Sequence, residues 1–164
     1  MEDPPEEPRW LNEEERQAWL ALASVLLRLP AALDTQLQRD AGMSHFEYQV
    51  MAAALSEHPD HTMRISDIAT LTEGSLARVS QAIGRLENRG WVRRTPDPTD
   101  GRYTLATLTE DGWAKVVDTA PGHVDAVRGF VFDPLTRAQV RQLTNIGRRI
   151  VHAVDPDADC LRRL

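Results

Sequence analysis

Cationic and hydrogen-bonding side chains are concentrated in one stretch of this 164-residue sequence, between Gly74 and Leu105. That stretch carries six arginines and three acidic residues, a net charge of +3, whereas the rest of the chain carries −9. Guanidinium groups bind phosphates and guanine edges, and serine and glutamine side chains also hydrogen-bond to bases. Because exposed charges act over a Debye length of about 8–10 Å, a basic stripe can attract a polyanion even though the whole chain is acidic.

The candidate DNA contacts follow from the spacing of apolar residues after Ser75. Four of these residues recur at intervals of 3, 4 and 3: Leu76, Val79, Ile83 and Leu86. This period predicts a helix that buries them and ends near Arg89. The residues between them are expected to face outward, with small Ala77 and Ala82 allowing close approach. The candidate contacts on this helix and at the start of the segment after it are Ser75, Ala77, Arg78, Gln81, Arg85, Arg93 and Arg94.

A shorter helix is predicted immediately before this one. Residues 65–71 place isoleucine and leucine on one face, and residues 72–74 have the composition of a tight turn. Gly90 stands where a helix commonly ends in a left-handed residue. Two helices joined by a short turn that contains glycine form a helix-turn-helix.

Two strands are predicted to follow, over residues 91–95 and 103–108. Between them, residues 96–102 are rich in Pro, Asp and Gly, which favour turns. A hairpin directly after a helix-turn-helix is a wing. The second helix can then enter the major groove while the hairpin places a cation in the adjacent minor groove.

The flanking segments also have the signals of helices. Three pairs place a capping residue three positions before Glu or Gln: Asn12 with Glu15, Ser44 with Glu47, and Thr136 with Gln139. Helices are predicted over residues 12–40, 44–57, 109–129 and 136–154.

Two prolines are expected to interrupt these helices, because proline lacks a backbone donor. Pro30 should kink or split the first helix, and Pro121 with Gly122 should break the fourth. Between residues 18 and 29 the first helix is apolar on most sides, which predicts burial on more than one side.

The predicted fold class is mainly α with a small β-hairpin wing: a winged helix-turn-helix flanked by N- and C-terminal dimerisation helices. The terminal helices carry more apolar surface than a small domain can bury alone, so a homodimer is expected. The expected segments are an acidic, Pro-rich tail (1–11), an N-terminal dimerisation helix region (12–43), the winged helix-turn-helix (44–108), C-terminal dimerisation helices (109–154) and a C-terminal tail (155–164).

The chain resembles the MarR family of winged-helix regulators. The matching residues are Ser66-Asp67-Ile68-Ala69, Leu76, Arg78-Val79, Leu86-Glu87, Arg89 to Arg94, Asp97-Pro98, Asp100-Gly101-Arg102, Leu108-Thr109 and Gly112. The resemblance implies a homodimer that binds double-stranded DNA at a near-palindromic operator, with repression as the expected outcome. It implies that Arg102 reads the minor groove and Asp100 orients that region. It further implies that a small molecule or an oxidant can alter the spacing of the two reading heads.

Two other function classes were weighed against this one. A winged-helix protein-interaction module without DNA binding is the alternative, permitted by the acidic body and by uncharged Ala77 and Ala82. An enzyme is not expected, because the sequence offers no nucleophile–base pairing, no glycine-rich phosphate loop and no metal-ligand cluster.

No cofactor and no metal site are expected, and no ligand-binding residues are assigned. His58 and His61 fit an exposed loop better than a metal site, and Trp10 and Trp19 fit packing better than a ligand pocket. Cys160, the single cysteine, is expected to be an incidental thiol. The longest mainly apolar stretch, ten residues with one serine (18–27), is shorter than the ~20 that a membrane helix needs, and the acidic start lacks secretory features, so a cytoplasmic location without membrane contact is expected.

Overall fold

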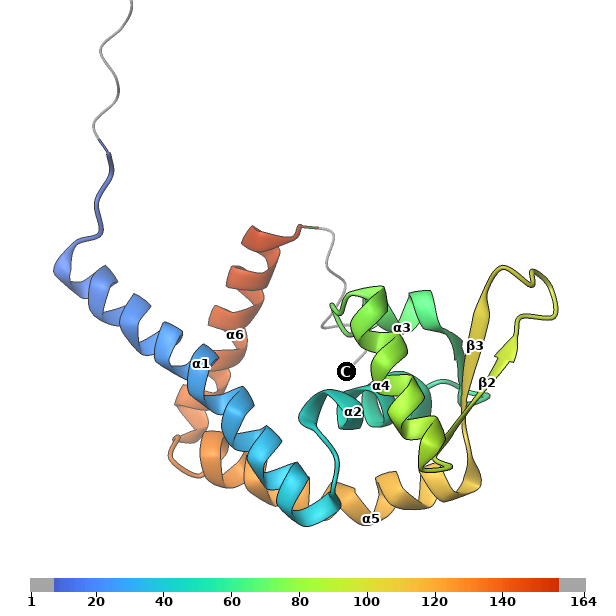
Figure 1. Ribbon diagram of the computed structural model, residues 1–164. Helices are drawn as coiled ribbons and strands as arrows, with labels where there is room; N and C mark the ends of the chain where they lie inside the picture. The colour runs from blue at the N-terminus through green and yellow to red at the C-terminus, as the bar shows by residue number, and fades with distance from the viewer. Residues whose placement is uncertain (1–7, 157–164) are drawn as a thin grey trace, which may run out of the picture.

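The computed structural model describes residues 8–156, in which helices dominate, as predicted. The elements in chain order are α1 (Glu13–Ala41), α2 (His45–Gln49), the π-helical segment η1 (Val50–Ser56), β1 (Thr62–Arg64), α3 (Ile65–Leu71), α4 (Leu76–Asn88), β2 (Val92–Pro96), β3 (Thr104–Leu108), α5 (Glu110–Val127), the π-helical segment η2 (Arg128–Phe132) and α6 (Arg137–Val154). Figure 1 shows α1 and α6 projecting on one side, the β2–β3 wing on the other, and α5 running beneath both. Cys160 lies outside the described residues.

The predicted helix starts are confirmed. At α1, the Asn12 side chain accepts the N–H of Glu15 at 2.9 Å, and the Glu15 carboxylate accepts the N–H of Asn12 at 3.0 Å. The same reciprocal pair starts α2 and α6. Each pair satisfies backbone donors that the first turn of a helix leaves without partners.

Neither proline ends its helix, so the expected split at Pro30 and the expected break at Pro121 were wrong. Pro30 lies inside α1 and Pro121 inside α5. Because proline has no N–H, each proline leaves the carbonyl four residues earlier without its helical hydrogen-bond donor. Those carbonyls belong to Leu26 and Val117, which are exposed, so water can replace the missing donor.

The sheet has a third strand that the sequence analysis missed. The antiparallel order is β1-β3-β2, and Thr62 of β1 pairs with Thr107 of β3. The two threonine hydroxyls lie 2.9 Å apart. A strand of three residues is too short to show the alternation by which strands are recognised. Its pairing ties the segment before α3 to the wing.

The core lies within the helix-turn-helix unit and its supports. The fully buried members include Leu37, Val50, Met51, Leu55, Ile68, Val79, Ala82, Ile83, Leu86 and Ala106. Two expectations for α4 were wrong: Leu76 is 59% exposed, and Ala82 is buried. Ala82 lies three residues after Val79 and four before Leu86, so it belongs to the same helical face. Leu76 lies in the first turn, beyond the end of this core.

Only the C-terminal third of α1 is buried in the single chain. Trp19, Leu20, Val25, Leu26 and Leu27 remain more than half exposed, whereas Leu22 is partly buried. By length and composition alone α1 could cross a membrane, with a mean hydropathy of 1.3 in its most apolar window. The ten-residue stretch therefore underestimated how much of α1 is apolar. An apolar face that packs in a soluble assembly meets the same criterion, so this is weak evidence for a membrane span.

Candidate nucleic-acid interface

The turn between α3 and α4 forms as predicted and fixes the start of α4. Glu73 adopts a left-handed conformation with φ of 49°, and the N–H of Gly74 donates to the carbonyl of Ala69 at 3.0 Å. A Cβ on Gly74 would lie 3.0 Å from the Phe46 ring, so close packing favours glycine there. The Ser75 hydroxyl then accepts the N–H of Arg78 at 3.2 Å and caps the helix.

The outward face of α4 begins with short side chains and continues with polar ones. Ser75, Ala77, Arg78 and Gln81 are all exposed, as predicted. The guanidinium carbon of Arg78 lies 3.9 Å from the centre of the Phe46 ring, a cation–π contact that orients the group while leaving its donors open. These side chains could hydrogen-bond to base edges or phosphates.

Arg85 is not free on this face. Its Nε donates to Oε1 of Glu47 at 2.6 Å, and the Glu47 side chain is only 3% exposed. Arg89 lies 3.7 Å from the other carboxylate oxygen. Burial alone would raise the pKa of Glu47, but hydrogen bonds from Arg85 and Ser44, with the charge of Arg89, bring it below its ordinary value. Glu47 therefore attaches α4 to α2.

Arg93 and Arg94 lie on opposite faces of β2, because successive side chains of a strand alternate. The Arg94 Nε donates to the carboxylate of Glu87 in α4 at 2.6 Å, so the Arg94 guanidinium is already paired with an acidic group. Within residues 8–156, Arg93 is exposed and makes no hydrogen bond or ion pair. The two arginines, predicted together, therefore differ in their availability to a phosphate.

At the wing tip, Asp100 orients Arg102. The Asp100 carboxylate accepts the backbone N–H of Arg102 at 3.1 Å and its guanidinium at 2.6 Å. The hydrogen bonds with Arg102 hold the pKa of Asp100 below its ordinary value. The Arg102 side chain is 85% exposed, so it extends from the wing with most of its surface open to a ligand.

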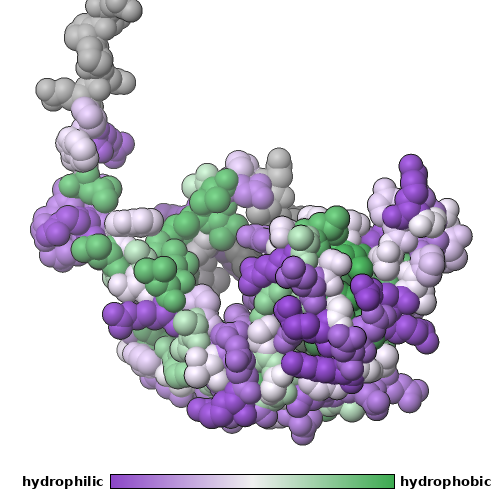
Figure 2. All heavy atoms as spheres, viewed as in Figure 1, coloured by the Kyte–Doolittle hydropathy of each residue, from purple (hydrophilic) through white to green (hydrophobic). Residues whose placement is uncertain are grey.

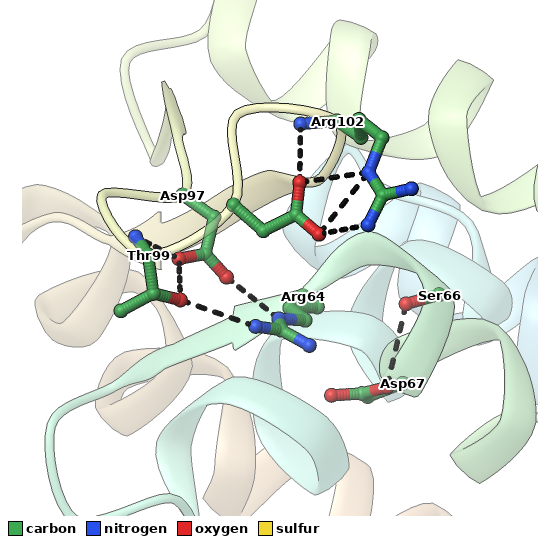
Figure 3. A network of polar contacts seen from close by, with 7 residues as sticks. Arg64, Ser66, Asp67, Asp97, Thr99 and Arg102 are labelled. Carbon is green, nitrogen blue, oxygen red and sulfur yellow. Dashed lines mark hydrogen bonds and ion pairs between the residues drawn. The ribbon is translucent and has the colours of Figure 1, made fainter.

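A second network, missed by the sequence analysis, holds the base of the wing (Figure 3). Asp97, 6% exposed, accepts the N–H and hydroxyl of Thr99 at 2.8 and 2.7 Å, and Nε of Arg64 at 2.6 Å. The Arg64 guanidinium also lies 4.5 Å from the centre of the Tyr103 ring. Arg64 is the residue immediately before α3, so this network joins the helix-turn-helix to the wing. The Asp-Pro-Thr sequence at 97–99 was a usable signal, since aspartate commonly bonds to the N–H two residues on.

The remaining candidates are the histidine and tryptophan residues that the sequence analysis considered for a metal site or a ligand pocket. Nδ1 of His61 contacts the carbonyl of Leu55 at 3.2 Å, and the His61 ring stacks on Trp113. Trp10 and Trp19 are 83% and 55% exposed, so neither packs within the single chain. A cavity of about 560 Å³ opens between α1 and α5, lined by Ala32, Thr35, Gln36, Arg39, Asp40, Gly122, Ala126 and Phe130.

A helix-turn-helix with a cationic second helix, followed by a hairpin with an exposed arginine at its tip, defines the class of winged-helix DNA-binding proteins. The MarR family model matches residues 51–102. The chain is 42% identical to Sco3205 from Streptomyces coelicolor, a MarR family transcriptional regulator solved in complex with DNA. That comparison covers 94% of this chain and 97% of Sco3205, with a TM-score of 0.86.

Two further relatives agree with this class. The HTH-type transcriptional regulator YfiV from Bacillus subtilis is 28% identical over 102 residues, which is 62% of this chain and 61% of YfiV. BpsR from Bordetella bronchiseptica, whose DNA binding is regulated by 6-hydroxynicotinic acid, is 25% identical. The comparison with BpsR covers 82% of this chain and 98% of BpsR, with a TM-score of 0.70. The chain belongs to the MarR family, and it is a DNA-binding transcription regulator; the protein-interaction alternative is not favoured.

Proposed function

We propose that the chain is a cytoplasmic, homodimeric repressor that binds a near-palindromic operator in double-stranded DNA. The observation that carries this proposal is the exposed face of α4 next to a wing whose Arg102 is 85% exposed. In this arrangement α4 enters the major groove, where Arg78 and Gln81 read bases, and Arg102 enters the minor groove. The short side chains of Ser75 and Ala77 let the backbone of α4 approach the DNA closely, and Arg93 binds a flanking phosphate.

The apolar surface of the terminal helices supports the dimer. In Figure 2 hydrophobic surface gathers over α1 and α6, whereas the helix-turn-helix unit shows many hydrophilic side chains around a smaller hydrophobic patch. Its large exposed members include Trp19, Leu20, Leu26, Leu27, Leu143, Ile146 and Ile150. A twofold axis through these helices would bury this surface in both chains. The two recognition helices would then reach half-sites about one helical turn, roughly 34–36 Å, apart.

We assign the cavity between α1 and α5 to a small-molecule effector. It lies where the dimerisation helix α1 meets the helix that continues from the wing, so its occupancy would favour one arrangement of the two reading heads. The ligand-regulated relative BpsR supports such an effector for this chain.

The test is binding to a labelled fragment from upstream of the chain's own gene and to a scrambled fragment, over several salt concentrations. We expect a specific complex of two chains per site. With 6–10 phosphate contacts, its affinity should fall about 10³–10⁵-fold between 50 and 200 mM salt. If both fragments bind weakly and equally, sites are selected from random DNA. A folded dimer that binds no DNA at all would contradict the proposal.

Light scattering at micromolar concentration tests the assembly separately. We expect the mass of two chains, and a monomer would overturn the dimer. Because this measurement needs no DNA, it separates an error about the dimer from an error about the operator.

A further inference from the structure

Leu76 is the first residue of α4 and is 59% exposed, whereas Val79, Ile83 and Leu86 on the same helix are fully buried. We propose that Leu76 determines base specificity by contacting the 5-methyl group of a thymine in the major groove. This inference rests on the proposed function, because it requires that α4 enters the groove.

Leu76 begins the first turn of α4, and its side chain is the longest apolar one exposed there. Residues near the start of a recognition helix are the ones that meet base edges. The Ser75 hydroxyl already accepts the N–H of Arg78, and Ala77 offers only a methyl group. Of these three residues Leu76 has the longest side chain, and it can offer only an apolar contact.

The chemistry of the groove then selects the partner of Leu76. Base edges in the major groove carry hydrogen-bond donors and acceptors, and the apolar group among them is the thymine methyl. A leucine set against the other base edges would cover polar groups without satisfying them, which is unfavourable. A leucine set against that methyl removes apolar surface of both partners from water.

A neighbouring cation supports this placement. Arg78 lies two residues further along α4, and its guanidinium is oriented over the Phe46 ring at 3.9 Å. It can hold the helix against a guanine or a phosphate while Leu76 meets the thymine. The half-site should therefore contain a required thymine in addition to the position that Arg78 contacts.

The experiment uses the full-length protein and a duplex selected from random DNA by the wild-type protein. Each thymine is replaced in turn by deoxyuridine, which differs only by the missing methyl. At one position per half-site we expect the affinity to fall about fourfold, the equivalent of one buried methylene-sized group. Leu76→Ala should bind the original duplex more weakly and lose this sensitivity to deoxyuridine.

Two variants sharpen the test. Val117→Ala, which shortens a 53% exposed side chain on α5, should keep the full deoxyuridine penalty. Leu76→Gln should shift the selected base at that position from thymine toward adenine, because glutamine bonds to the adenine edge. The inference would be overturned if the wild-type protein bound the thymine and deoxyuridine duplexes equally at every position. It would also be overturned if Leu76→Ala lost as much affinity on deoxyuridine replacement as the wild type does. Failure to select any DNA would instead contradict the proposed function on which it rests.

Discussion

Glu47 and Arg85 join α2 to the recognition helix through one ion pair, with Arg85 Nε 2.6 Å from Glu47 Oε1. The carboxylate is buried and the arginine side chain is half exposed. The other oxygen of Glu47 accepts the N–H of Ser44 at 2.8 Å. One carboxylate thus caps α2 and positions α4, which makes Arg85 a structural residue in the free protein.

Replacing Arg85 and Arg93 separately should have different effects. Arg85→Ala leaves a buried carboxylate with a weaker partner, so the free energy of unfolding should fall by about 1–3 kcal/mol. Arg93→Ala removes a side chain that is free in the structure, so stability should not change, but the slope of log affinity against log salt should shrink by about 1. Urea unfolding and salt titration of DNA binding check both. Equal stability losses in the two variants would contradict this division.

Arg102→Ala should weaken binding to the operator by about 1–3 kcal/mol at fixed salt, because it removes the proposed minor-groove contact. The thermal midpoint should not move, since the side chain is 85% exposed. Asp100→Asn should cost less, because it loosens the orientation of Arg102 but keeps its charge. Unchanged affinity of Arg102→Ala would refute the contact.

Asp97→Asn should loosen the wing and lower stability in a pH-dependent way. Hydrogen bonds from the Thr99 side chain and backbone, then the bond from Arg64, hold the pKa of Asp97 well below its ordinary value of 3.8. The stability it contributes is therefore present above about pH 4 and is lost as the pH falls through the lower folded value. Wild type should lose more stability than Asp97→Asn on acidification below pH 4. Parallel curves in urea unfolding would rule this out.

Two histidines between α2 and α5 should make stability depend on pH below neutrality. Burial lowers the pKa of His45, although Asp34 opposes the shift; burial and then repulsion from His45 lower the pKa of His123. The Tyr48 ring is tilted against the His123 ring, with 4.6 Å between their centres, and the Gln36 amide oxygen lies 3.3 Å from Nδ1 of His123.

Because both folded values lie under the ordinary 6.5, the unfolded chain binds more protons. Stability should be full above pH 6.5 and fall as the pH drops through the folded values. Replacing His123 by Gln should flatten the curve of urea midpoint against pH between 7.5 and 5. A variant curve as steep as that of the wild type would count against this.

Two glycine-to-alanine changes in helices should have opposite signs. A Cβ on Gly112 would lie 2.0 Å from the carbonyl oxygen of Trp91, so Gly112→Ala should destabilise the fold by about 1–3 kcal/mol or more. A Cβ on Gly84 meets no atom within 4 Å, so Gly84→Ala should stabilise α4 by up to about 1 kcal/mol. Differential scanning calorimetry of the two variants checks the signs.

The helices and the wing could be predicted from local signals, because capping pairs, apolar periods and turn residues act over a few positions. What failed depends on distant parts of the chain. β1 exists because β3 pairs with it, and the prolines are tolerated because their turns face solvent. Leu76 is exposed because the core ends before the first turn of α4.

The candidate site divides in the same way. Residue type and helical spacing were enough to predict the outward position of Ala77, Arg78 and Gln81. They could not show that Arg85 is paired, because Glu47 lies 38 residues away. The wing network was hidden for the same reason, since Arg64 and Asp97 are 33 residues apart.

The attachment of α5 at both ends makes that helix a lever. Near its start, the Thr109 hydroxyl donates to the Gly90 carbonyl at 2.7 Å. Gly112 packs so closely against the Trp91 carbonyl that a Cβ there would lie 2.0 Å from its oxygen. Further along, His123 contacts Gln36 of α1. Its 18 residues span about 27 Å. A pivot of about 5° at the α1 end would therefore carry the end beside the wing through about 2 Å. The proposed effector would thus move the wing without touching the residues proposed to contact DNA.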